Sequence, residues 1–326
     1  MKYLLGRLAF TLAAMWAALS LAFVLPRLIP GDPGTVLLAN FRGKLRPEAV
    51  EAMRSVFGLS REPLLAQYFG YLRGMLSGEL GTSISRFPAP VTDVIAGAFG
   101  WTIVLGGVAV VFSFVLGSAL GLFAAWRRGG VLDAILPGAL TLLGALPYFW
   151  VATLALYWLG YGVGWFPVRH AHDDALLPGW NLAFVKSAIA HAVLPATTIV
   201  VATLGGWLLG MRNTVVGVLH EDFMTFARGQ GLGTARLMAY AARSALLPNL
   251  TAFGMALGFV VSGALLTEVV FAYPGQGYLL MSAVASLDYP LIQGLYLTIT
   301  LSVLGANLLL DLVTVWLDPR LRGQSR

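Results

Sequence analysis

The fold of this chain is decided by residues 99–126, FGWTIVLGGVAVVFSFVLGSALGLFAAW, a run without Asp, Glu, Lys or Arg. One transmembrane helix needs roughly 20 predominantly apolar residues, so this run is long enough to span a membrane. Five more long runs lack those four residue types: 8–26, 134–168, 191–211, 244–267 and 289–310. We predict an all-α polytopic membrane protein with six transmembrane helices, one for each run.

The composition supports this class and excludes others. Of the 326 residues, 58% are hydrophobic and 11% are charged, whereas soluble chains carry about 25% charged residues. The net charge of +6 indicates orientation in the membrane, because no basic stripe with interleaved aromatic residues suggests a nucleic-acid partner. The chain has no cysteine, which excludes a disulfide framework and a thiolate metal site.

Lys and Arg residues set the predicted orientation. With a cytoplasmic N-terminus, the inside segments hold 11 of them, and the short outside loops hold only Arg169 and Lys186. We therefore place both termini in the cytoplasm. The first run resembles a signal peptide, but Leu25-Pro26-Arg27 is not a small-residue cleavage site, so we predict a retained span.

We predict an external helical insertion after the first span. Two amphipathic helices are expected there, one from Pro47 to Gly58 and one from Pro63 to Gly78, resting on the membrane surface or on a partner subunit. Residues 160–167 predict an aromatic interfacial segment. The expected parts are 1–30, tail and first helix; 31–98, external lobe; 99–318, five-helix core with a cytoplasmic loop at 212–248; and 319–326, cytoplasmic tail.

Residues 219–248, LHEDFMTFARGQGLGTARLMAYAARSALLP, form a polar island among the apolar runs. Glu221 and Asp222 favour the start of a short helix and Arg228 its end, as the helix dipole requires. Helical spacing groups Phe223, Phe226, Ala227 and Gln230 on one face. Two cytoplasmic phenylalanines would form an exposed apolar patch unless another surface covers them.

A second helix is expected in the same loop. Gly231 turns the chain, and Thr234 is a candidate N-cap. Leu237, Tyr240, Ala241 and Ser244 would share one side, and Pro248 would start the fifth span. The loop is interpreted either as a docking site for another protein or as a hairpin packed against its own spans.

Two motifs in this loop carry a resemblance to a known family. ARGQGL at residues 227–232, followed by RSALLP at residues 243–248, resembles the EAA-type coupling loop of binding-protein-dependent ABC importer permeases. The similarity is to the dipeptide/oligopeptide branch. Gly229 and Gln230 depart from the usual Ala and Lys, and a mid-helix glycine costs roughly 1 kcal/mol.

Further motifs extend the resemblance over nearly the whole chain. PGDP at 30–33 is similar to the family's turn after the first span. The family's external lobe is resembled by FGL at 57–59 and by GELG at 78–81, which is followed by Ser83. The family's E-x-x-F-x-x-P-G-x-G is matched from Glu268 to Gly277. DYP at 288–290 and LDPR at 317–320 complete the series.

The resemblance implies a type I ABC importer permease in a bacterial-type cytoplasmic (inner) membrane. Its expected partners are a second permease subunit, two cytoplasmic ATPase subunits, an external solute-binding protein and the lipid bilayer. No cofactor is expected on this chain, since no G-x-x-x-x-G-K-[ST] motif occurs and ATP and Mg would bind the ATPases. The implied ATPase-coupling residues are Glu221, Asp222, Phe223, Phe226, Ala227, Arg228 and Gly231. The outer gate candidates lie in the matched motif: Glu268, Phe271, Pro274, Gly275 and Gly277. Glu268 is a candidate because it is an acid near the outer end of its span, where it would serve as a gate or as a structural hydrogen-bonding group.

The solute and the second permease, a different chain or a copy, stay open at this point. Peptides are the leading solute, with oligosaccharides or nickel as alternatives. A stand-alone secondary transporter is the rival class, although the spans carry few of the acids or bases that proton coupling uses. An enzyme is not expected, because neither H-E-x-x-H nor G-x-S-x-G occurs. The His170–Asp174 cluster is interpreted as a solvated loop rather than a metal site.

Overall fold

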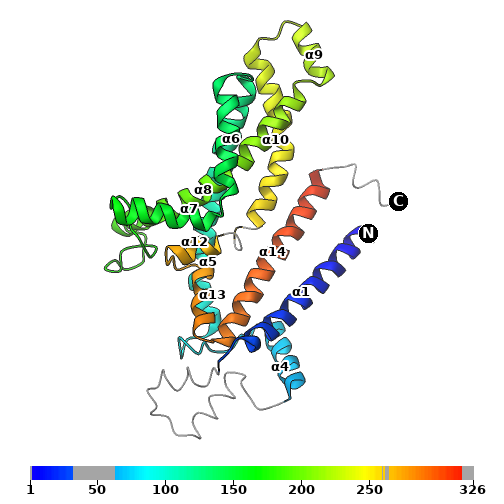
Figure 1. Ribbon diagram of the computed structural model, residues 1–326. Coiled ribbons are helices and arrows are strands. Elements are labelled where there is room, and N and C mark those ends of the chain that lie inside the picture. The colour runs from blue at the N-terminus through cyan, green and yellow to red at the C-terminus, as the bar shows by residue number, and fades with distance from the viewer. Residues whose placement is uncertain (1, 32–62, 259, 261–263, 318–326) are drawn as a thin grey trace. The chain divides into compact units, whose positions relative to one another are not determined.

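The computed structural model describes residues 2–31, 63–258, 260 and 264–317. Every regular element in these residues is a helix, apart from one isolated bridge between Thr82 and Pro90 (Figure 1). The chain divides into two units: residues 1–102 with 274–326, and residues 103–273. The first unit therefore combines the two ends of the chain, and the second is its continuous middle.

In the first unit, α1 (Lys2–Leu28) lies beside α14 (Tyr289–Leu317), as Figure 1 shows. The core of this unit lies between α13 (Gln276–Ala285), the start of α14 and the start of α5 (Val91–Trp126). Val91, Ile95, Leu279 and Leu295 are buried in it. The apolar stripe on each helix is thus covered by the others.

A buried carboxylate joins residues that lie about 200 positions apart in the sequence. Asp288 is fully buried and accepts hydrogen bonds from the hydroxyls of Ser83 at 2.5 Å and Ser85 at 2.8 Å. It also accepts from the backbone N–H of Ser85 at 2.9 Å and of Leu291 at 3.2 Å. A buried carboxylate needs such donors to offset its lost hydration. Asp288 therefore fixes the segment before α5 to the start of α14.

In the second unit, close helix contacts depend on glycine. A Cβ on Gly121 of α5 would collide with the carbonyl oxygen of Leu208 in α8 (Leu182–Val218). A Cβ on Gly205 would lie 2.6 Å from the carbonyl oxygen of Leu140 in α6 (Val131–Ala145). Small residues permit this approach in lipid, where apolar burial alone does not drive helices together. The backbone of α8 therefore contacts the backbones of both α5 and α6.

The third predicted span is broken rather than straight. Helix α6 ends at Ala145, and α7 (Tyr148–Ala155) with the π-helix η1 (Leu156–Gly162) continues at 93° to it. Pro147 stands at the N-cap of α7, where its missing N–H does no harm. Tyr157, Trp158, Tyr161 and Trp165 are 61–71% exposed, which suits an interfacial aromatic segment.

The other spans follow the prediction to different degrees. Four helices, α1, α5, α8 and α14, are long and apolar enough to cross a membrane, and the bent α6–α7 pair makes up to five. The fifth predicted span corresponds to α10 (Thr234–Gly258) and α12 (Leu265–Val270). Between them, residues 259 and 261–263 lie outside the described residues. The structure thus confirms the all-helical class, while the count of six remains a prediction.

The second helix predicted for the insertion is present as α4 (Leu64–Ser77), which ends at Gly78 with φ 78°. Its place outside the membrane remains a prediction. Its predicted apolar face does not stand alone, because Tyr68 and Tyr71 pack on Phe23 of α1. The first predicted helix, from Pro47 to Gly58, lies outside the described residues, as does the tail at 319–326.

Candidate functional site

The proposed contact helix of the loop is α9 (Asp222–Gly229). Asp222 lies in its first turn and Arg228 in its last, which is the charge order that the helix dipole favours. Gly231 ends it with φ 77°, while Leu232 N–H donates to the carbonyl of Ala227 at 3.3 Å and Gly231 N–H to that of Arg228 at 2.9 Å. These two bonds define a Schellman motif, which explains the glycine at 231.

One face of α9 is seated on its own chain. Met224 is fully buried and Ala227 is 8% exposed. Both belong to a cluster that we name the loop base, which contains Ala125 of α5, Met211 and Val215 of α8, and Leu237, Met238, Ala241 and Ala245 of α10. The loop base therefore ties α9 to three longer helices.

The adjacent face of α9 is open. Phe223 is 48% exposed and Phe226 is 68% exposed. Glu221, Asp222 and Arg228 are also exposed. Two aromatic rings among ionic side chains form a compact patch of the composition that protein interfaces use.

The predicted grouping of Ala227 with the two phenylalanines is wrong. Ala227 faces the loop base, whereas Phe226 and Gln230 are exposed. The i, i+3, i+4 rule gives residues that are neighbours, but it does not say where a face ends. Met224 was missed because a single methionine in a polar stretch gives no periodic signal.

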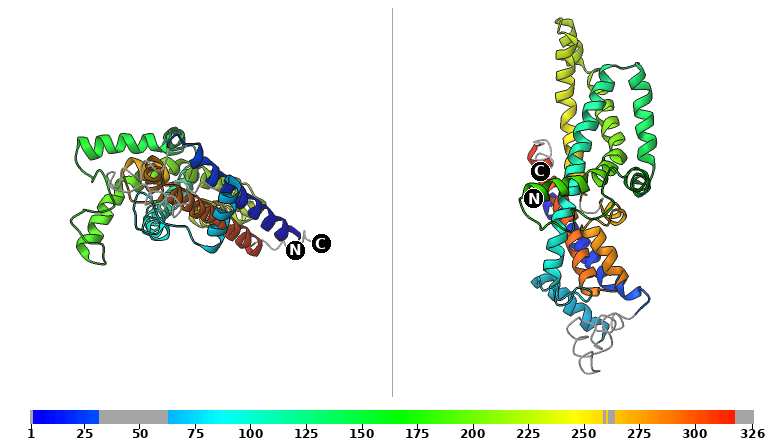
Figure 2. Two further views of the ribbon diagram at one scale, coloured as in Figure 1. Left: turned by 90° about the horizontal axis from the view of Figure 1, so that it is seen from below. Right: turned by 90° about the vertical axis from the view of Figure 1, so that its left-hand side faces the viewer.

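The second helix of the loop and the fifth span form one element. Helix α10 runs from Thr234 to Gly258 with Pro248 inside it, so the expectation that Pro248 starts a new helix is wrong. The carbonyl of Gly233 accepts from the N–H of Leu237 at 3.2 Å, which makes Gly233, not Thr234, the N-cap. Figure 1 shows α9 beside the tip of α10, and Figure 2 gives two further views of the same ribbon.

Side chains bridge the helices next to this loop. Asn249 donates to the carbonyl of Ala245 at 2.8 Å and to the sulfur of Met211 at 3.6 Å, which joins α10 to α8. Arg212 donates from Nε to the carboxylate of Asp133 at 2.5 Å, which joins α8 to α6. No local pattern in the sequence indicates the Arg212–Asp133 pair, because its members lie 79 residues apart.

The outer gate candidates fall into different parts of the fold. Glu268 and Phe271 are buried in the second unit, at α12 and its C-cap. Burial, together with the nearby carboxylate of Glu268, raises the pKa of Tyr273 above its usual range. Pro274, Gly275 and Gly277 belong to the first unit, at the start of α13. There, Gln276 N–H donates to the hydroxyl of Thr102 at 2.8 Å.

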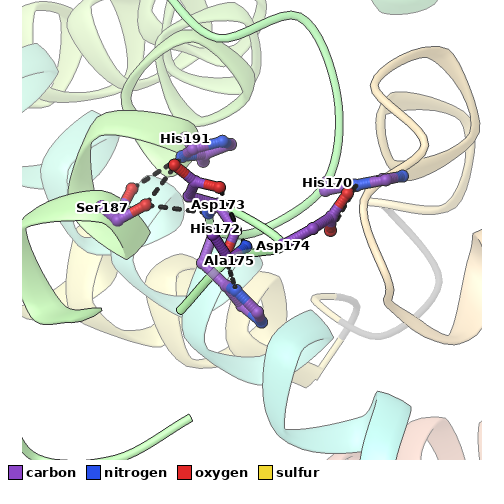
Figure 3. A network of polar contacts seen from close by, with 7 residues as sticks. All are labelled: His170, His172, Asp173, Asp174, Ala175, Ser187 and His191. Carbon is purple, nitrogen blue, oxygen red and sulfur yellow. Dashed lines mark hydrogen bonds and ion pairs between the residues drawn. The ribbon is translucent and has the colours of Figure 1, made fainter. Parts of the chain in front are cut away.

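The polar contacts of the histidine-rich loop fall into two separate groups (Figure 3). His170 pairs with Asp174 at 2.9 Å, and Ser187 bonds to the backbone N–H of Asp173 at 2.9 Å and to His191. His170 has φ 66°, and its N–H donates to the carbonyl of Phe271 at 3.2 Å. Among the described residues, no three His, Asp or Glu side chains gather in a way that could hold a metal ion.

A cavity of about 600 Å³ lies between helices of the second unit. Its twelve lining residues are uncharged and mostly small or apolar, with the hydroxyls of Thr141 and Thr203 and the ring of Trp207 as polar points. They come from α5, α6, α8 and α10. Three of these helices, α5, α8 and α10, contribute to the loop base, and α6 is joined to α8 by the Asp133–Arg212 pair. The lining is Val110, Leu140, Thr141, Gly144, Ala145, Ala202, Thr203, Gly205, Gly206, Trp207, Leu209 and Ala256.

Comparison with known proteins identifies the family. Residues 117–323 match the family described as "binding-protein-dependent transport system inner membrane component". The chain belongs to this family. With its several apolar helices, this permease is a multi-pass protein of the inner membrane.

Relatives match the permease over its whole length. It is 33% identical to a putative peptide permease protein of Brucella suis, over 99% of both chains. It is 31% identical to the dipeptide transport system permease protein of Escherichia coli, over 100% of both chains. It is also 31% identical to the oligopeptide transport system permease protein of Haemophilus influenzae, over 99% of both.

Proposed function

We propose that this permease is one of two translocation subunits of an ATP-driven importer. Its partners would be a second permease, two cytoplasmic ATPases and an external solute-binding protein. The family supports this assembly. The six predicted spans, with both termini in the cytoplasm and the lobe at 31–98 outside, place the loop at 212–248 on the ATPase side of the membrane.

The observation that carries the proposal is the division of α9 into two faces. Met224 and Ala227 hold the helix on the loop base, while Phe223 and Phe226 stay open among charges. An ATPase that binds the open face would move α9, and the loop base would pass that displacement to α5, α8 and α10. Because α10 continues without interruption into the fifth span, the displacement would bias the bundle between inward-open and outward-open states.

Peptides are the proposed solute. The relatives named above are described as peptide, dipeptide and oligopeptide permeases. Mass spectrometry of the solute that copurifies with the partner binding protein would test this. Di- or oligopeptides are expected, whereas an oligosaccharide or a nickel complex would contradict the assignment.

The coupling face is tested by Phe226→Ala in the permease reconstituted with its partners. Truncating a buried aromatic anchor of an interface costs about 2 kcal/mol, so we expect ATP-driven uptake to fall by about tenfold or more. Tyr161→Ala is the matched control, since Tyr161 is 69% exposed on η1, and it should retain uptake. Full uptake and ATPase association in Phe226→Ala would refute the loop assignment.

We also propose that the cavity between α5, α6, α8 and α10 is part of the solute path. Its uncharged lining would admit peptides of varied side chains without holding their charges. Gly206 lines it, and a Cβ there meets nothing within 4 Å, so Gly206→Leu should narrow the cavity while the fold is kept. We expect slower uptake of long peptides than of dipeptides in competition assays.

The control for this test is Gly205→Ala, next to it. There the added Cβ would lie 2.6 Å from the carbonyl oxygen of Leu140, so it should separate α6 from α8 and lower the yield of assembled complex. If Gly206→Leu slowed all peptides equally, or none, the cavity would not be the path.

A further inference from the structure

Helix α4 has two apolar faces, and its own chain covers only one of them. The covered face carries Tyr68 and Tyr71: the hydroxyl of Tyr68 lies 2.7 Å from that of Ser20, and the hydroxyl of Tyr71 donates to the carbonyl of Leu19 at 3.1 Å. The other face carries Leu65, Phe69 and Leu76, which are 71%, 65% and 80% exposed. Their spacing of four and seven residues aligns them in one strip along the helix.

The contacts with α1 fix the depth of this strip. Leu19, Ser20 and Phe23 lie within the apolar window Ala9–Leu28 of α1. Phe23 and Leu19 precede the end of that window by five and nine residues, which corresponds to roughly 8 to 14 Å at 1.5 Å per residue. Half of the hydrocarbon core is about 15 Å thick. Measured from the end of this apolar window, the contacts of α4 with α1 lie within the thickness of one leaflet.

The polar groups of α4 lie where an interfacial helix would have them. Gln67, near its start, accepts a hydrogen bond from Arg27 at 3.2 Å, close to the end of the α1 window. Arg73 is the exposed ionic side chain of this helix. With 14 residues, α4 is about 21 Å long and too short to span the bilayer.

The composition of the strip suits contact with lipid. Leu65, Phe69 and Leu76 carry no hydrogen-bonding group that acyl chains would leave unpaired. At the same depth α1 also exposes Leu21, Val24 and Leu25, by 57%, 45% and 41%. The strip on α4 and this part of α1 are thus two apolar surfaces at one level of the membrane.

We propose that α4 is embedded in the extracytoplasmic leaflet, with Leu65, Phe69 and Leu76 in contact with lipid acyl chains and with Tyr68 and Tyr71 holding it to α1. Its contacts run from Arg27 at Gln67 to Leu19 at Tyr71, so α4 follows α1 into the leaflet and acts as an amphipathic anchor there. The external lobe is thereby fixed to the membrane at its α4 end. This inference goes beyond the transport function and does not depend on the solute.

The chain has no cysteine, so single nitroxide labels can be placed without removing native thiols. We would label Phe69→Cys and Leu76→Cys in the permease assembled with its partners in vesicles of phosphatidylethanolamine and phosphatidylglycerol. Leu21→Cys, exposed on α1, is the lipid control, and Arg86→Cys, exposed beyond α4, is the water control. Collision rates with molecular oxygen and with a water-soluble nickel chelate would be compared.

We expect residues 69 and 76 to favour oxygen over the nickel chelate, with a ratio within about twofold of that at residue 21 and at least fivefold above that at residue 86. A ratio equal to that at residue 86 would show the strip in water and overturn the proposal. Exclusion of both reagents, with cross-linking from residue 69 to the second permease, would show a protein partner and overturn it as well.

Discussion

The two short helices α9 and α4 both expose large apolar side chains, but they differ in what surrounds them. On α9, Phe223 and Phe226 lie among Glu221, Asp222 and Arg228, and all five are exposed. On α4, the exposed strip has Arg73 as its one exposed ionic neighbour within the helix.

The two helices also differ in how their inner faces are held. The inner face of α9 uses Met224 and Ala227 in an apolar cluster shared by three helices. The inner face of α4 uses two tyrosines whose hydroxyls bond to one helix, α1. We infer that exposed apolar area alone does not define a docking surface. The charges beside it separate a protein-binding face from a lipid-binding one.

The largest effect is expected from Met224→Asp. An unpaired carboxylate in the loop base would cost several kcal/mol, so α9 should leave its seat and uptake should be lost. Limited proteolysis of the loop in membranes would measure the seating. Thr225→Asp adds the same charge at an exposed neighbour and should leave the loop as protected as in the native chain. Equal protection in both variants would show that the loop base does not hold α9.

A smaller effect is expected at the two glycines that end these helices. Gly231 and Gly78 have φ 77° and 78°, and alanine in this conformation costs about 1 kcal/mol. Gly231→Ala should lower uptake several-fold, because it shifts α9 on its base. Gly78→Ala should lower the thermal stability of the complex in detergent but leave initial uptake rates within about twofold. If Gly78→Ala lowered uptake and Gly231→Ala lowered only thermal stability, the coupling role would belong to α4 and not to α9.

The smallest effect is expected from Tyr71→Phe. It removes the hydrogen bond to the carbonyl of Leu19, which contributes about 1 kcal/mol, and keeps the ring contact with Phe23. A decrease of a few degrees in the thermal midpoint of the detergent-solubilised complex is expected, with unchanged uptake. Leu72→Ala on the same helix serves as a packing control, and an unchanged midpoint in Tyr71→Phe would mean that the bond is not formed in the membrane.

Sequence reasoning predicted the elements that depend on long or local signals. Charge-free runs identified α1, α5, α8 and α14, and the acid and arginine order identified α9. It could not predict contacts between distant residues, such as Arg212 with Asp133 or Asp288 with Ser83. It also misplaced Pro248, because a proline that fits the start of a helix fits equally inside one when neighbouring helices support it.

The sequence predicted the exposed face of α9 but not the face that packs on the loop base. Phe223 and Phe226 stand out in a polar loop, so their exposure could be expected. Met224 and Ala227 are recognised only when α5, α8 and α10 are in place, because those helices supply the other members of the loop base.

The hydrogen bonds of Asp288 also bear on how the chain is made. Ser83 and Ser85 leave the ribosome about 200 residues before their acceptor, and α1 precedes its neighbour α14 by a larger interval. During membrane insertion, the first part of the chain must therefore wait while residues 103–273 are synthesised. The last helix then completes a unit whose other half was inserted first, so the packing of α1 and the burial of Ser83 are finished only when α14 is in place.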